Sequence, residues 1–163
     1  MARGILVAIL ALWATASVAA DDASLLLKKF EGDWVAENEE ARTEMRWSEA
    51  LGGKFMRIEY RINVKNETGE TPVFDGTAYY QLAEGESLRA FWADTGGSLH
   101  PVSARREGNA MIAHWGRPDE GEQGRSRYEL LPSGGVEVTD WVKTGDGWRR
   151  FNHNVFTRVS APD

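Results

Sequence analysis

The chain has 163 residues, a formal net charge of −6 at pH 7 and no cysteine. Its acidic balance argues against nucleic acid and against anionic membrane surfaces as partners, because both select basic patches. Without cysteine there are no disulfides and no thiol-linked lipid anchor, so the core alone must stabilise the fold.

The first twenty residues have the three features of a secretory signal peptide. Arg3 supplies a positive charge, residues 5–13 form an apolar run too short to span a bilayer, and small residues at 17–20 precede Asp21. We therefore expect cleavage after Ala20 and export to the periplasm or the extracellular space. The other 163 − 20 = 143 residues, 21–163, have the length of one domain and contain no membrane-spanning apolar run.

The mature segment is predicted to open with one short helix and to continue entirely as strands. Residues 21–30 have Asp21 or Asp22 as an N-cap and leucines at near-helical spacing. Within residues 54–65 the side chains alternate between apolar and polar from Met56 onward, as in a strand with one buried face.

Turn-forming residues recur at nearly regular intervals after the helix and divide the chain into ten predicted strands. The strands are expected to begin near Gly32, Arg42, Lys54, Thr71, Leu88, Ser98, Ala110, Arg125, Val136 and Trp148. Strands spaced by about 8–12 residues and joined by glycine turns predict an all-β sandwich or barrel.

Gly32-Asp33-Trp34, directly after the predicted helix, resembles the Gly-x-Trp signature of the lipocalin and calycin superfamily. In that family the tryptophan closes the barrel floor and an arginine of the last strand lies across it; Arg158 occupies the corresponding place here. The resemblance implies a single antiparallel up-and-down β-barrel in which Trp34 and Arg158 are structural. Further segments resemble bacterial exported lipocalin-like domains of unknown function: 51–55, 78–80, 91–94 and 113–116.

The last predicted hairpin places a polar pair inside the barrel. Asp146-Gly147 is typical of a two-residue type I′ turn, and this turn would set Asp140 directly opposite His153 on the inner face. Such a pair is either a satisfied polar contact within the core or a site in which the carboxylate orients the imidazole toward a ligand.

Alternation also directs aromatic side chains inward: Trp47, Tyr60, Tyr80 and Tyr128. They form either the wall of a ligand cavity or a filled aromatic core. For the fifth to seventh strands, alternation puts Phe91, Val102 and Trp115 on one face and Trp92, Ser103 and His114 on the other, and does not indicate which face is inside.

These patterns favour a non-enzymatic barrel that binds a small apolar or amphipathic molecule through Trp47, Tyr60, Tyr80, Tyr128, Asp140 and His153. No catalytic motif is present, the three histidines lack zinc-type spacing, and no cofactor is predicted. One alternative is a haem protein resembling the nitrobindins, which implies His153 as axial ligand, although residues 35–38 depart from their glycine-rich sequence. Another is an enzyme in which Asp140 orients His153 as a general base. The sequence does not indicate an oligomeric state.

Overall fold

A computed structural model describes residues 22–159 except 120 and 146. The predicted signal peptide, residues 1–20, lies outside the described residues. None of the helices in the described part of the chain is long and apolar enough to cross a membrane.

The described residues form one short helix followed by ten strands, as predicted, and every strand begins within two residues of its expected start. The elements are α1 (Ala23–Lys29), β1 (Gly32–Glu37), β2 (Ala41–Ala50), β3 (Phe55–Asn66), β4 (Gly69–Gln81), β5 (Ser87–Asp94), β6 (Leu99–Glu107), β7 (Ala110–Gly116), β8 (Gln123–Leu130), β9 (Val136–Thr144) and β10 (Gly147–Arg158).

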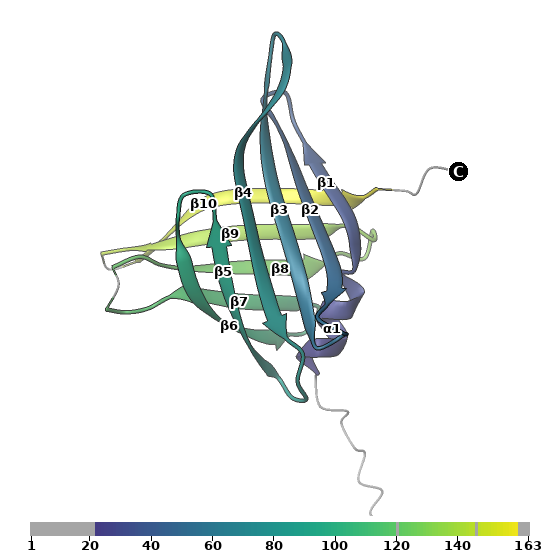
Figure 1. The fold of residues 1–163 in the computed structure, drawn as a ribbon, viewed down its shortest axis with the longest axis vertical. Coiled ribbons are helices and arrows are strands. Elements are labelled where there is room, and N and C mark those ends of the chain that lie inside the picture. The colour runs from purple at the N-terminus through teal and green to yellow at the C-terminus, as the bar shows by residue number, and fades with distance from the viewer. Residues whose placement is uncertain (1–21, 120, 146, 160–163) are drawn as a thin grey trace, which may run out of the picture.

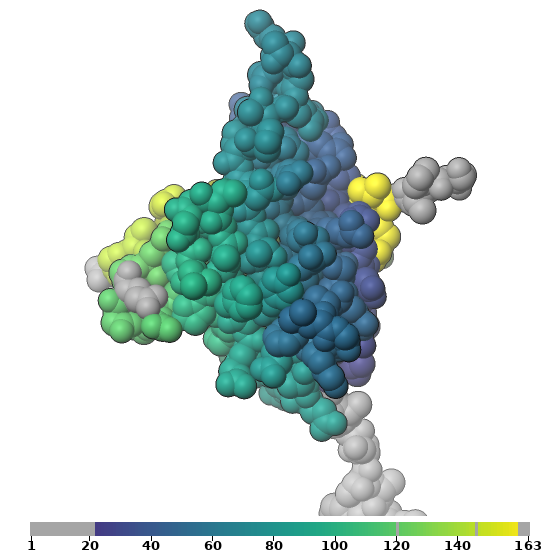
Figure 2. All heavy atoms as spheres, viewed as in Figure 1, coloured from purple at the N-terminus to yellow at the C-terminus, as the bar shows by residue number. Residues whose placement is uncertain are grey.

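The strands form a single closed antiparallel barrel in which each pairs with its sequence neighbours and β10 returns to β1. This confirms the predicted all-β up-and-down barrel. Figure 1 shows β2, β3 and β4 running steeply across the more level β6–β10, with α1 beneath one end. The hairpin between β3 and β4 stands clear of the body (Figure 2).

The helix begins where the chain offers a cap and ends against the barrel. The Asp22 carboxylate accepts a hydrogen bond from the Ser24 amide at 2.8 Å, which satisfies one of the free N–H groups of the first turn. Leu26, Leu27 and Phe30 are completely buried, so the helix closes this end of the barrel with its apolar face.

The short seam between β1 and β10 is held by Arg158. In the described part of the chain the seam pairs Trp34 with Arg158 and Val35 with Thr157, and the Val159 amide donates to the Asp33 carbonyl at 2.8 Å. The guanidinium carbon lies 4.2 Å from the centre of the Trp34 ring, and Nη1 donates to the Glu31 carbonyl at 2.6 Å. This is the contact that the Gly-x-Trp resemblance implies, and a cation–π contact of this kind contributes about 0.5–2 kcal/mol.

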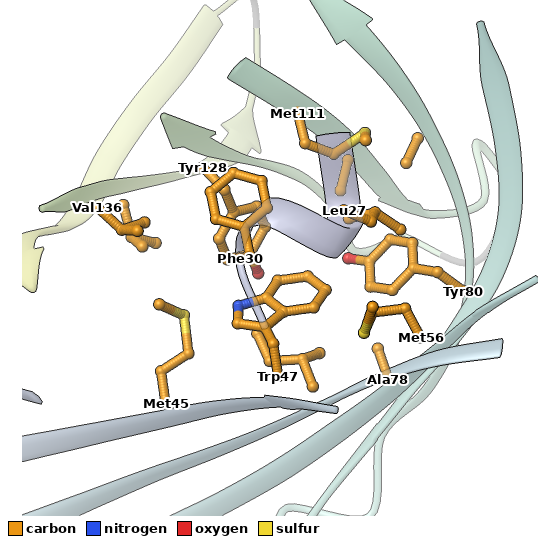
Figure 3. Close-up of a cluster of buried hydrophobic side chains, with 14 of the residues drawn as sticks. Leu27, Phe30, Met45, Trp47, Met56, Ala78, Tyr80, Met111, Tyr128 and Val136 are labelled. Atoms are coloured by element: carbon orange, nitrogen blue, oxygen red, sulfur yellow. The ribbon is translucent and has the colours of Figure 1, made fainter. Parts of the chain in front are cut away.

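Aromatic side chains fill the barrel immediately above the helix. Trp47 stacks on Phe30, with ring centres 5.6 Å apart, and contacts Tyr80 and Tyr128, each at 5.5 Å. Figure 3 shows these rings together with Met45, Met56 and Met111. The lower part of the barrel is therefore a packed core.

We expect Gly32→Ala to destabilise the protein through the seam. Gly32 has φ +128°, and a Cβ atom there would overlap Nη1 of Arg158. Gly69→Ala is a matched control, because Gly69 has φ +126° with no atom within 4 Å of such a Cβ. Urea unfolding should show a larger loss for Gly32→Ala, by about 0.5–2 kcal/mol, the value of the displaced cation–π contact. Equal losses would show that Arg158 does not hold the seam.

Candidate functional site

A bulge in β10 decides which side chains enter the upper barrel. On the side of the β9–β10 turn, Arg150 pairs with Trp141. On the other side of the bulge Asn152 pairs with Asp140, and Phe151 between them has no partner on β9. The turn also lies one residue earlier than predicted, since Thr144 pairs with Gly147. Because neighbouring side chains on a strand point to opposite faces, one extra residue reverses the faces of all that follow.

The predicted opposition of Asp140 and His153 is therefore wrong. His153 pairs with Thr139 and lies on the outer face, where its Nε2 is 2.8 Å from Glu137 Oε1. Its side chain is 43% exposed. The position that alternation assigned to His153 belongs to Asn152.

The Asp140 carboxyl group is instead hydrogen-bonded to neutral polar side chains. Nδ2 of Asn152 donates to Asp140 Oδ2 at 2.6 Å and lies 3.4 Å from the Tyr60 hydroxyl oxygen. The Ser126 hydroxyl, from β8, hydrogen-bonds to the same carboxyl group. Asn154 extends the cluster by donating to Asn152 Oδ1 at 2.9 Å.

Above the packed core this cluster borders a cavity of about 460 Å³. Of the six side chains predicted to bind ligand, Tyr60, Tyr80, Tyr128 and Asp140 line it, Trp47 belongs to the core, and His153 is outside. The other lining residues are Ile62, Phe74, Trp92, Asp94, Ser98, His100, Val102, Ala113, Trp115, Glu122, Ser126, Val138, Phe151 and Asn152.

Strands β5–β7 supply the lining residues that sequence reasoning missed. Trp92 pairs with His100, and both line the cavity with Trp115, so the inner face combines members of the two predicted sets. The cause is the loop after β5. The Asp94 amide donates a hydrogen bond to the Ser98 carbonyl, so the loop contains three residues where the sequence predicted a two-residue turn. The pair Gly96-Gly97 gave no sign of that extra residue.

His100 offers the cavity a polar group of its own. Its ring lies 5.4 Å from that of Trp115, and its Nδ1 is buried without a hydrogen-bond partner among the described residues. A buried ring nitrogen is ordinarily hydrogen-bonded, so this atom is an exception among the described residues.

Burial governs the ionisation of the cavity groups. It raises the pKa of Asp140 above its ordinary value, while hydrogen bonds from Ser126 and Asn152 act in the opposite direction. Burial, reinforced by the Asp140 charge, raises the pKa of Tyr60 to about 12 and also raises the pKa of Tyr80 and of Tyr128. At neutral pH the three tyrosines are therefore uncharged hydroxyl groups.

A second hollow, of about 820 Å³, is open and lined largely by charged side chains of β1–β4. Those charges are paired with one another: Arg42 with Glu44 at 3.0 Å and Arg61 with Asp75 at 2.6 Å. Because exposed, mutually satisfied pairs leave little binding capacity, the aromatic cavity is the stronger candidate site.

Comparison with known proteins supports the fold alone. No family model matches the chain, and no curated protein matches it in sequence. Among solved structures, the chain is similar to the crystal structure of Rv2717c from M. tuberculosis, with a TM-score of 0.59 and 13% identity. The match covers 85% of this chain and 98% of that one.

A double-mutant cycle should distinguish Asn152 from His153 as the partner of Asp140. We expect Asp140→Ala and Asn152→Ala to be coupled by at least about 0.5 kcal/mol in urea unfolding, because their side chains share a hydrogen bond. Asp140→Ala and His153→Ala should be additive within about 0.3–0.5 kcal/mol. The reverse pattern would mean that β10 has no bulge at Phe151.

The raised pKa of Asp140 predicts a stability that falls as pH rises. As the pH rises above 3.8, the ordinary pKa, Asp140 of the unfolded chain loses its proton while the same group in the folded protein keeps it. The free energy of unfolding therefore decreases with pH until the raised pKa of the folded state is passed. Asp140→Asn has no titrating carboxyl group, so it avoids this decrease in the free energy of unfolding, and its side-chain oxygen still accepts the hydrogen bond from Asn152. Thermal unfolding should give the variant the higher Tm at pH 7 and a smaller advantage near pH 3.5. A variant less stable at pH 7 would contradict the burial effect.

Proposed function

We propose that the barrel binds a small amphipathic molecule in the cavity above its core. The observation that carries this proposal is a volume of about 460 Å³ walled by tryptophan, tyrosine and phenylalanine, with a few polar groups converging on it. Ligand sites commonly have about 300–1,000 Å³ and this composition. The aromatic wall would take the apolar part of the ligand, and Asp140, Asn152 and His100 its polar part.

Two further features support a binding role over a purely structural interior. The aromatic groups next to the helix are packed against one another, so the chain is able to fill its barrel where it does so. Higher up, the interior holds the polar cluster around Asp140 and Asn152 instead. Buried polar groups weaken a core unless something satisfies them, which favours a ligand as their purpose.

We also propose that the protein acts outside the cytoplasm as a lipocalin-like barrel. Export rests on the signal-peptide features of residues 1–20. The lipocalin resemblance is supported by the contact of Arg158 with Trp34. The haem and enzyme alternatives both required His153 inside the barrel; with its Nε2 beside Glu137 on the outer face, neither is proposed.

Direct binding of a neutral fluorescent probe tests the proposed binding site. We expect N-phenyl-1-naphthylamine to gain fluorescence with the mature protein, and Ala113→Leu, which adds bulk to the cavity wall, to weaken its binding about tenfold or more. His114→Leu is the matched control, because the next residue of β7 lies on the outer face. Failure of the probe to bind, or equal weakening by both substitutions in folded protein, would overturn the proposed site.

A further inference from the structure

The charged groups of the cavity are almost all of one sign. Asp94, Glu122 and Asp140 line it, while no lysine or arginine of residues 22–159 is among the lining residues that the structure describes. The two arginines of β10 on the turn side of the bulge, Arg149 opposite Val142 and Arg150 opposite Trp141, are exposed and are not part of the lining. A ligand entering the cavity thus meets a negative potential.

The three carboxylates differ in what already satisfies them. Asp94 accepts bonds from the Trp92 indole at 2.9 Å and from the Gly96 amide at 2.9 Å, so it is engaged in its own turn. Glu122 has a side chain 62% exposed, with Oε2 4.0 Å from His100 Nε2. Asp140 is half-buried, and its hydrogen-bond partners among the described residues are the neutral side chains of Asn152 and Ser126.

A carboxylate in this position lacks a compensating cation. Its two oxygens have room for about four hydrogen bonds, of which the protein supplies two. Neutral donors leave its charge uncompensated, which is costly away from water. A ligand that brings a positive charge would remove this cost, whereas an anionic ligand would add to it.

The aromatic wall suits the same kind of ligand. Trp92 and Trp115 line the cavity with Tyr60, and the faces of such rings attract cations as well as apolar groups. A carboxylate enclosed by aromatic rings is thus complementary to an organic cation.

We propose that the cavity selects protonated amines with a small aromatic or apolar body, the ammonium group bonding to the Asp140 carboxylate. This rests on the proposed function, because it names the ligand class of the same cavity. The body of the amine packs against the tryptophans, and the ammonium donates to the oxygen positions of Asp140 that Asn152 and Ser126 leave free.

Three ligands of one shape test this selectivity by isothermal titration calorimetry at pH 7: 2-phenylethylamine, 2-phenylethanol and 3-phenylpropanoate. We expect the amine to bind about tenfold or more tightly than the alcohol, the scale of a charge-assisted hydrogen bond, and the acid to bind most weakly. Asp140→Asn should remove most of the preference for the amine while leaving the alcohol nearly unchanged. Glu137→Gln is the matched control and should keep the preference, because Glu137 is a carboxylate of the same strand that faces His153 outside the barrel and does not line the cavity.

The outcomes separate this inference from the proposed function. If the neutral probe binds but the amine has no advantage over the alcohol, or keeps its advantage in Asp140→Asn, the ligand class is wrong and the cavity remains a binding site. If neither the probe nor any of the three ligands binds, both proposals fail. The Tm of each variant shows that it is folded.

Discussion

The contents of the barrel depend on one extra residue in β10. Phe151 has no partner on β9, and the strand resumes its pairing with Asn152 opposite Asp140. Through this single bulge two asparagines enter the interior, while His153 turns outward to Glu137. Phe151 itself lines the cavity. A bulge commonly redirects side chains in this way next to a functional site, and here it supplies the neutral donors that allow a carboxylate to remain inside.

The barrel divides into a part that is filled and a part that is hollow. The helix, Trp47 and the rings around it pack together at one end, where Arg158 and Trp34 also complete the seam. These contacts stabilise the closed sheet without using the upper interior. Packing at one end thus leaves the other end to hold polar groups and empty volume, so the groups that stabilise the barrel are separated along its axis from those that line the cavity.

Sequence alone predicted the fold and much of the wall, and it failed where one residue changed the alternation. Period-two patterning correctly buried Met45, Trp47, Met56 and Ile58, because β2 and β3 pair without interruption. The three-residue loop after β5 and the bulge at Phe151 each shift the inward–outward alternation of side chains by one residue. The sequence therefore did not predict His100 in the cavity lining, and it placed His153 inside the barrel where the structure has Asn152. Neither irregularity has a signature in the residues that form it. Whether the rings of Trp47 and Tyr80 fill the barrel or border a cavity depended on their packing in three dimensions.

If the Asp140 carboxylate in its aromatic cavity holds a cationic ligand, a crystal of the mature protein soaked with 2-phenylethylamine should reveal it. We expect electron density for the amine within the cavity, its nitrogen at hydrogen-bonding distance from the Asp140 carboxylate and its ring against Trp92 or Trp115. A cavity that stays without the amine, or an amine bound with its nitrogen directed away from Asp140, would contradict this expectation.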